Sequence, residues 1–160
     1  MPFVFHPYVQ GFVDRVRAGG PDAYGLPAEL TVSDGQGNPC RSCLDQVPAG
    51  TAMLVLAARP FPAAQPYAET GPIFLCADAC TPFAAPGLPP VLVTSPHYLL
   101  KGYGADHRII SGTGAVVAQE ALIPYAGSVF SRPDVAYVDV RSARNNCFLT
   151  RITRSHDSQS

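Results

Sequence analysis

Four of the five cysteines form two close pairs, Cys40 with Cys43 and Cys76 with Cys80. Paired thiolates with two to four intervening residues are a common arrangement for binding structural zinc. A dithiol with two intervening residues, such as Cys40/Cys43, is also the arrangement found in thiol redox enzymes. Free cysteine is in addition among the most buried residue types and packs as a small apolar side chain. The pairs therefore allow three interpretations: metal binding, redox chemistry or packing alone.

The sequence around the pairs favours free, buried thiols. Neither pair is followed by the glycine that commonly lets the backbone wrap a zinc ion. Cys76 and Cys80 follow an expected strand, so their side chains cannot be assumed to face the same way. Pro48 leaves room for at most one helical turn after Cys43, whereas a redox dithiol normally opens a helix. We therefore expect no cofactor. A zinc ion bound by Cys40, Cys43, Cys76 and Cys80, or redox chemistry at Cys40/Cys43, is the alternative.

A second set of polar residues lies on an expected hairpin near the C-terminus. Alternation along residues 135–141 places Tyr137, Asp139 and Arg141 on one face of a strand. Arginine binds carboxylate and phosphate groups through two parallel hydrogen bonds, so an arginine cluster that includes Arg144 could hold a small anion. The alternative is a solvated sheet face with cross-strand ion pairs.

If the protein has a binding site, we expect it where the first cysteine pair, an expected strand near Gly71 and the C-terminal hairpin converge. The candidate site residues are Cys40, Arg41, Gly71, Arg141, Arg144 and Cys147. No catalytic residue can be named. The sequence lacks a Gly-x-Ser-x-Gly nucleophile motif, a phosphate-binding loop, a dinucleotide fingerprint and a His-Glu-x-x-His motif.

Composition narrows the class of protein. Charged residues make up 14% of the chain, against roughly 25% in an ordinary domain, which favours an apolar pocket or a homodimer interface. A net charge of −1 predicts no binding to nucleic acid or to an anionic membrane. The N-terminus resembles no signal peptide, and no apolar stretch is long enough to span a membrane. We expect a cytoplasmic protein, in which thiols are kept reduced.

The expected elements indicate the α+β class. We expect a single domain over residues 1–154 and a disordered polar tail over 155–160. The domain contains an antiparallel sheet of hairpins, an N-terminal helix, and a helix between the two C-terminal hairpins. The predicted elements are a helix after Pro7, strands at 29–33, 51–58 and 73–76, a hairpin of 98–103 with 107–112, a helix at 116–130 shortened or kinked at Pro124, and a hairpin of 135–141 with 147–153.

Four segments together resemble a known family: Pro39-Cys40-Arg41, residues 66–74, the Tyr103/Asp106 turn and residues 143–148. On these segments the chain, from about residue 26 to residue 154, resembles the bacterial domain-of-unknown-function family 1203. The resemblance implies a small soluble bacterial protein, with no activity, substrate or cofactor to carry over. In the family's pattern Cys40 has the same neighbours, while Cys43 occurs in some relatives only, which counts against an obligatory four-cysteine zinc site. The N-terminal helix departs from the family's longer opening.

Taken together, the sequence predicts a homodimeric domain that binds a small molecule or anion without an identifiable catalytic constellation. A structural zinc protein, a thiol redox enzyme and a purely structural or protein-interaction module are the alternatives.

Overall fold

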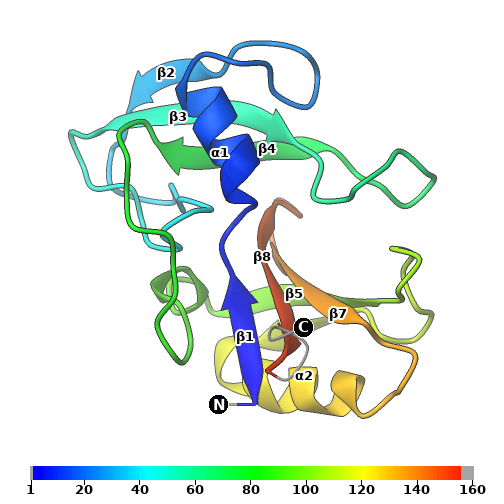
Figure 1. Ribbon diagram of the computed structural model, residues 1–160. Helices are drawn as coiled ribbons and strands as arrows, with labels where there is room; N and C mark the ends of the chain where they lie inside the picture. The colour runs from blue at the N-terminus through cyan, green and yellow to red at the C-terminus, as the bar shows by residue number, and fades with distance from the viewer. Residues whose placement is uncertain (1, 156–160) are drawn as a thin grey trace.

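The chain folds into two antiparallel sheets, which lie one above the other in Figure 1. The computed structural model describes residues 2–155. The upper sheet has the strand order β2-β3-β4, with β2 (Glu29–Val32), β3 (Ala52–Ala58) and β4 (Gly71–Cys76). The lower sheet has the order β1-β8-β7-β5-β6, with β1 (Phe3–His6), β8 (Phe148–Arg154), β7 (Tyr137–Ser142), β5 (His97–Tyr103) and β6 (Ala115–Ala118). The helices of the described chain are α1 (Gln10–Arg17) and α2 (Leu122–Phe130), and short 3-10 turns lie at Pro90–Leu92 and Gln119–Ala121.

The predicted α+β class is confirmed, including the N-terminal helix and the helix between the two C-terminal hairpins. The first of these hairpins is β5–β6 and the second is β7–β8. Within residues 2–155, neither helix is long and apolar enough to cross a membrane.

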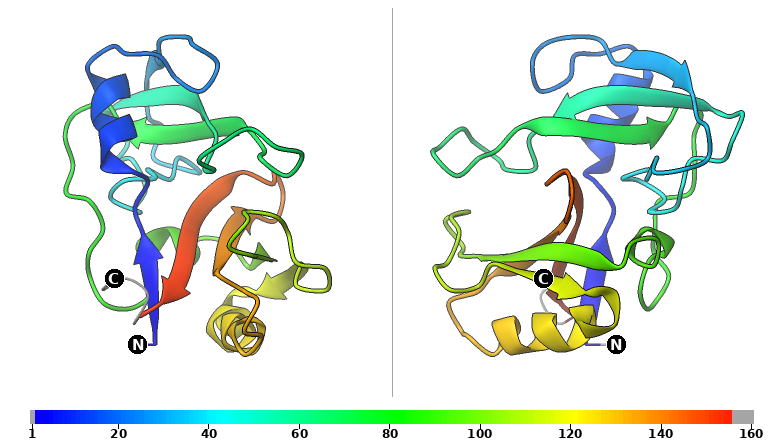
Figure 2. Two further views of the ribbon diagram at one scale, coloured as in Figure 1. Left: turned by 45° about the vertical axis from the view of Figure 1, so that its right-hand side comes forward. Right: turned by 180° about the vertical axis from the view of Figure 1, so that it is seen from behind.

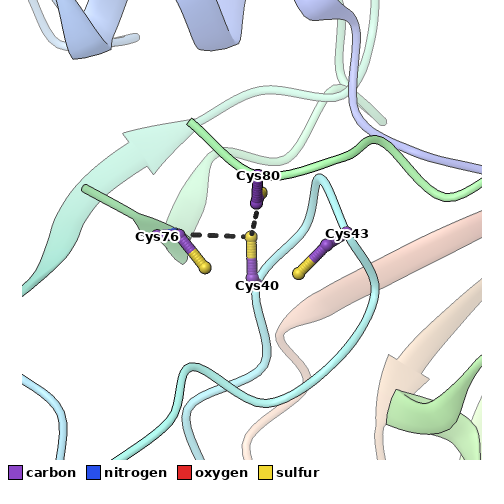
Figure 3. Close-up of side chains that lie close together, drawn as sticks. All are labelled: Cys40, Cys43, Cys76 and Cys80. Atoms are coloured by element: carbon purple, nitrogen blue, oxygen red, sulfur yellow. Dashed lines mark hydrogen bonds between the residues drawn. The ribbon is translucent and has the colours of Figure 1, made fainter. Parts of the chain in front are cut away.

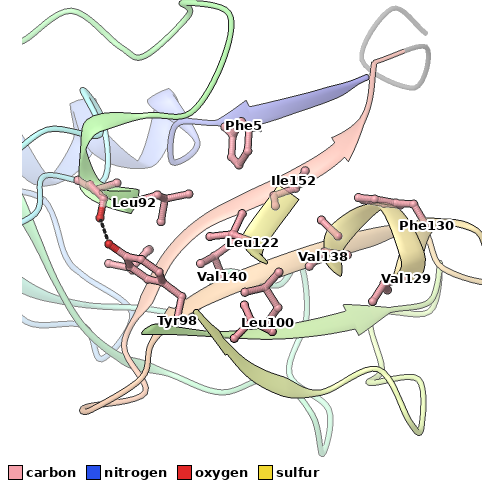
Figure 4. Close-up of a cluster of buried hydrophobic side chains, with 14 of the residues drawn as sticks. Phe5, Leu92, Tyr98, Leu100, Leu122, Val129, Phe130, Val138, Val140 and Ile152 are labelled. Carbon is pink, nitrogen blue, oxygen red and sulfur yellow. Dashed lines mark hydrogen bonds between the residues drawn. The ribbon is translucent and has the colours of Figure 1, made fainter. Parts of the chain in front are cut away.

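One hydrophobic core lies between the lower sheet and α2. Alternate residues of β7, Val138 and Val140, are fully buried in this core together with Leu122 of α2. Side chains from β1, β5, β7, β8 and α2 meet there (Figure 4). The buried Tyr98 hydroxyl donates a hydrogen bond of 3.0 Å to the carbonyl of Val91, so this polar group is satisfied inside the core.

A second core lies between the upper sheet and α1, which the two views of Figure 2 show beside β3 and β4. Val13 and Val16 are buried on one face of α1 and meet Leu56 of β3 in this core. The helix ends before Gly19, whose φ of +91° is a conformation that favours glycine. The predicted helix after Pro7 is thus confirmed.

The first C-terminal hairpin differs from the prediction. β5 pairs with β6 rather than with residues 107–112, of which Ile109 forms an isolated bridge with Tyr103. Residues 115–118 were predicted to be mostly helical, but α2 begins later, at Leu122. Pro124 accounts for this start, because a residue without an amide hydrogen fits the first turn of a helix and disrupts its interior.

The first strand was not predicted at all. β1 pairs with β8, and Phe5 opposite Ile152 is buried in the lower core. Four residues are too few to show a strand period in the sequence. Of the predicted disordered tail, Ser155 donates its amide hydrogen to the carbonyl of Pro2, and residues 156–160 lie outside the described residues.

The two sheets are joined at Arg41, whose side chain is buried. Its amide donates to the carbonyl of Phe74 in β4, and its own carbonyl accepts from the amide of Tyr8 between β1 and α1. Its guanidinium donates from Nε to the carbonyl of Phe148 in β8 at 2.7 Å, and from Nη1 to the carbonyl of Pro39 at 2.6 Å. A single residue therefore connects the upper sheet, the lower sheet and the segment between β1 and α1.

Replacing Arg41 tests this connection. Arg41→Met keeps much of the side-chain volume but removes the donors to the carbonyls of Phe148 and Pro39. Hydrogen bonds to a charged group contribute about 1.5–3 kcal/mol each, so we expect the free energy of unfolding to fall by about 3 kcal/mol or more. Urea denaturation measures this loss. The control Arg144→Met changes an exposed arginine and should cost less than about 0.5 kcal/mol. Equal stability of the two variants would contradict the role of Arg41.

Candidate metal centre and neighbouring arginine pocket

The structure brings the two cysteine pairs together. The sulfur atoms of Cys40, Cys43, Cys76 and Cys80 all lie within 4.8 Å of one another, and those of Cys40 and Cys80 are 3.8 Å apart (Figure 3). In a tetrahedral zinc site with Zn–S bonds of about 2.3 Å, the sulfurs are about 3.8 Å apart. The cluster is therefore within about 1 Å of the geometry of a four-thiolate metal site.

The first pair is positioned by a tight turn that follows a bridge to β4. Cys40 pairs in parallel with Phe74, and the amide of Leu44 donates to the carbonyl of Cys40 at 3.0 Å. Leu44, directly after Cys43, has a φ of +56° and is fully buried. A leucine with positive φ is uncommon and persists only where the surrounding packing holds it. Leu44 thus adopts the left-handed conformation that a glycine commonly supplies after a metal-binding pair.

The second pair is positioned by β4 and the loop that follows it. Cys76 is the last residue of β4 and lies opposite Met53 of β3. The amide of Ala77 donates to the carbonyl of Ala52, and the chain then turns so that Cys80 reaches the other three sulfurs. The sequence left the relative orientation of Cys76 and Cys80 open, and this turn decides it.

Several N–H groups point at the sulfurs. Cys40 Sγ accepts hydrogen bonds from the amides of Ser42 at 3.4 Å and Cys76 at 3.3 Å. Arg17, at the end of α1, donates from Nη2 to Cys80 Sγ at 3.1 Å and from Nε to the carbonyl of Cys76 at 3.1 Å. N–H donors and a nearby positive charge both favour the thiolate form of cysteine, which is the form that binds metals.

Cys40, Cys43 and Cys76 differ in how readily they ionise. A hydrogen bond from the Cys43 thiol lowers the pKa of Cys40 to about 4, against the opposing effect of burial and with help from the amides of Cys76 and Ser42. The pKa of Cys43 is raised by its hydrogen bond to Cys40 and by burial. Burial and the negative charge of Cys40 raise the pKa of Cys76 to about 12. The negative charge of the Cys40 thiolate therefore keeps the neighbouring thiols protonated, because two thiolates side by side would repel each other. A divalent cation would offset this repulsion, since thiols bound to a metal are deprotonated.

The polar face of β7 is buried rather than solvated. Tyr137, Asp139 and Arg141 share one face as predicted, and all three are buried. The alternative interpretation is right about a cross-strand ion pair but wrong about solvation: Arg151 of β8 donates to both oxygens of Asp139, from Nε at 2.7 Å and from Nη2 at 3.0 Å. Burial raises the pKa of Asp139, and the hydrogen bonds and charge of Arg151 oppose that rise.

A cavity of about 220 Å³ adjoins this face, between the start of β4 and the β7–β8 hairpin. Its walls include Gly71, Arg141 and Cys147, which are three of the six predicted site residues. The other three lie elsewhere. Arg41 is enclosed and bonded to backbone carbonyls, Cys40 belongs to the sulfur cluster, and Arg144 is exposed on the hairpin turn beside a separate depression.

Three residues beside the candidate sites were not predicted from the sequence. Arg17 reaches the sulfurs from a helix that is distant in sequence, and no local signal indicates this contact. Glu69 and Lys101 form an ion pair of 3.6 Å beside the cavity. Glu69 lies in the segment 66–74 that supports the family resemblance, and this was the only available signal for it.

Removing Arg151 tests the buried pair and predicts a pH dependence. Arg151→Met leaves the Asp139 carboxylate buried without its two donors, so we expect a loss of about 3–5 kcal/mol in the free energy of unfolding at pH 7. Without Arg151 the pKa of Asp139 in the folded state rises further above its unfolded value, so protonation at low pH favours the folded state. The loss relative to the wild type should therefore shrink as the pH falls towards about 4.

Urea denaturation of both proteins across this pH range measures the effect. As the control, Asp139→Asn in the Arg151→Met background removes the titrating group and should abolish this additional pH dependence. A loss of unfolding free energy that is the same at all pH values would contradict the assignment of the pH dependence to Asp139.

Comparison with known proteins identifies a family. No curated protein matches the chain, and no solved structure matches it. The family model described as "Protein of unknown function (DUF1203)" matches residues 37–154, which is most of the chain. The matched range contains all five cysteines and the cavity residues, and it leaves out β1, α1 and β2. The chain therefore belongs to the DUF1203 family, as its resemblance indicated.

Proposed function

We propose that this protein binds one zinc ion through Cys40, Cys43, Cys76 and Cys80. The single observation that carries the proposal is the approach of all four sulfur atoms to within 4.8 Å of one another. Four protein thiolates complete a tetrahedral shell and leave no position for water or substrate. The ion therefore has a structural role, and it cross-links the turn at residues 40–44 to β4 and to the loop after it.

The surroundings of the cluster favour a metal over free thiols. A zinc ion with four thiolates carries a net charge of −2, and two arginines are near enough to offset it. Arg17 donates directly to Cys80 Sγ, and the buried Arg41 interacts with the charge of Cys40. Hydrogen bonds to metal-binding sulfurs orient the ligands and tune their basicity. Zinc and iron both accept four thiolates in a tetrahedron, so metal analysis decides between them.

The same geometry favours a metal centre over redox chemistry at Cys40/Cys43. Cys40 has Cys80, a member of the other pair, at 3.8 Å, so the dithiol is not isolated. A turn rather than a helix follows Cys43. In the cytoplasm, where we expect this bacterial protein, thiols are kept reduced and remain available as ligands. The homodimer expected from the low charge content stays a prediction.

Metal analysis tests the proposal directly. Protein purified under reducing conditions and reconstituted with zinc should retain about one zinc per chain after desalting. Cys76→Ser and Cys80→Ser each remove one ligand and should abolish stoichiometric retention. Cobalt(II) in place of zinc should give thiolate-to-cobalt charge-transfer bands and the visible absorption of a tetrahedral site.

The matched control is Cys147→Ser, which removes the cysteine outside the cluster and should leave both the zinc content and the cobalt spectrum unchanged. Reconstituted wild-type protein that retains less than about 0.2 zinc per chain and gives no such spectrum would overturn the proposal.

A second prediction concerns Arg17. Arg17→Met removes the donor to Cys80 Sγ and a positive charge beside the cluster. Loss of such an outer-shell partner typically weakens metal affinity about 10–100-fold, and we expect a loss in this range. Competition with a chromophoric zinc chelator measures the affinity. Arg15→Met is the control on the same helix, because Arg15 stacks on Phe12 and bonds to the carbonyl of Pro21. Equal affinities of the two variants would show that Arg17 has no role in metal binding.

A further inference from the structure

We propose that the cavity beside β7 binds a small anion that carries a carboxylate or phosphate group, and that Arg141 is the residue that recognises it. The proposal goes beyond the metal centre and rests on different residues. The cavity lies between the start of β4 and the β7–β8 hairpin, and Glu69, Gly71, Arg141, Asn146 and Cys147 are among its walls.

The first observation is that one edge of the Arg141 guanidinium has no hydrogen bonds. Arg141 is 4% exposed, and its Nη1 donates to the carbonyl of Asn146 at 2.9 Å. Its Nε and Nη2 are buried and have no hydrogen-bond partner among the described residues. Buried donors are nearly always paired, because an unpaired one loses its hydration without compensation. The free edge therefore calls for an acceptor that binds there.

The same two nitrogens of another arginine, Arg151, bind a carboxylate elsewhere in this protein. Nε and Nη2 lie on one edge of the planar guanidinium and match two oxygens of a carboxylate or a phosphate. Arg151 uses the same two nitrogens to bind the two oxygens of Asp139, at 2.7 and 3.0 Å. The free edge of Arg141 is thus the edge that recognises an oxyanion.

A third unpaired group lies in the same region. The hydroxyl of Tyr103 is buried without a hydrogen bond of ordinary length and angle among the residues that the structure describes. It lies beside the Arg141 side chain, whose charge and hydrogen-bonding groups lower the pKa of Tyr103 against the larger effect of burial. Burial raises the pKa of Tyr103 to about 12, so the hydroxyl keeps its proton. The region therefore contains a neutral donor in addition to the cationic edge.

The local charge leaves room for one more negative group. Glu69 Oε1 lies 3.7 Å from Arg141 Nη2 and 3.6 Å from Lys101 Nζ, and both distances are longer than those of hydrogen bonds. Asp139 is paired with Arg151 and also interacts with the charges of Arg141 and Lys101. Three cations thus face two carboxylates in this region. The Glu69 side chain is 38% exposed, so it can move outwards when a second anion enters.

The volume limits the size of the ligand. A cavity of about 220 Å³ is smaller than the roughly 300–1,000 Å³ of sites for drug-sized molecules. The ligand is therefore a compact anion with few non-hydrogen atoms.

Binding of three probes tests the proposal and separates the two oxyanion types. Inorganic phosphate, acetate and oxalate are titrated into the reconstituted protein at constant ionic strength, with chloride as the reference, and affinity is followed by calorimetry and by the shift in melting temperature. Binding by oxalate and acetate alone would identify a carboxylate site, and binding by phosphate alone a phosphate site.

Two variants should shift the affinity in opposite directions. Arg141→Lys keeps the charge but loses the paired donors, and we expect at least about tenfold weaker binding. Glu69→Gln removes the competing negative charge, and we expect about threefold or more tighter binding. Arg144→Lys, on the same hairpin but exposed and outside the cavity, is the matched control and should bind as the wild type does.

Cys147 supplies a readout that does not depend on how well Arg141→Lys folds. Its thiol borders the cavity and is partly exposed, so a bound anion should slow its alkylation by iodoacetamide. Peptide mass spectrometry separates Cys147 from the four clustered cysteines. If none of the three anions stabilises the protein or protects Cys147 in the millimolar range, the proposal is overturned. If the Glu69→Gln variant binds the anions only as tightly as the wild type does, the proposed site is equally overturned.

Discussion

The fold depends on one buried residue, Arg41, whose guanidinium binds a carbonyl of the lower sheet and whose backbone amide binds a carbonyl of the upper sheet. Placing a guanidinium in a protein interior is costly unless its donors are satisfied, so the segments that supply these carbonyls must meet around it. The carbonyls belong to Phe148 at the start of β8 and to Pro39 before the first cysteine pair, while the backbone of Arg41 binds β4. The same residue therefore sets the distance between the sheets and the position of Cys40.

The two candidate sites lie on either side of this residue. Cys40 precedes Arg41 and belongs to the sulfur cluster, and Phe148, which accepts from Arg41, forms part of the cavity wall beside Arg141. Both sites follow the same physical rule, since a buried arginine is stable only beside anions or acceptors. Beside the cluster the acceptors of the buried Arg41 are carbonyls, and the half-buried Arg17 donates to a carbonyl and to Cys80 Sγ. At the cavity one edge of Arg141 still lacks its acceptor.

Much of the secondary structure was predictable because periodicity and chain-breaking residues are local signals. The long apolar run of β3 and the Gly-Gly-Pro stop after α1 are examples, and both elements lie where they were predicted. β1 was missed because four residues show no period, and β6 was mistaken for the start of a helix because its valines fit either element. The burial of Asp139 and Arg141 was also unpredictable, since alternation shows which residues share a face but not whether another segment of the chain covers it.

For the candidate metal centre, the sequence by itself determined which cysteines form pairs and that their spacing suits a metal ion. It also identified the arginines of the last hairpin as candidate anion ligands, in one expected site with Cys40 and Arg41. The tertiary structure alone decided that the two pairs meet, that Arg17 reaches Cys80, and that Gly71, Arg141 and Cys147 share a cavity while Arg144 does not. The reason is that ligand spacing within a pair is a local property of the chain. Convergence of residues that are about 40 positions apart depends on the pairing of β3 with β4 and on the bridge between Cys40 and Phe74.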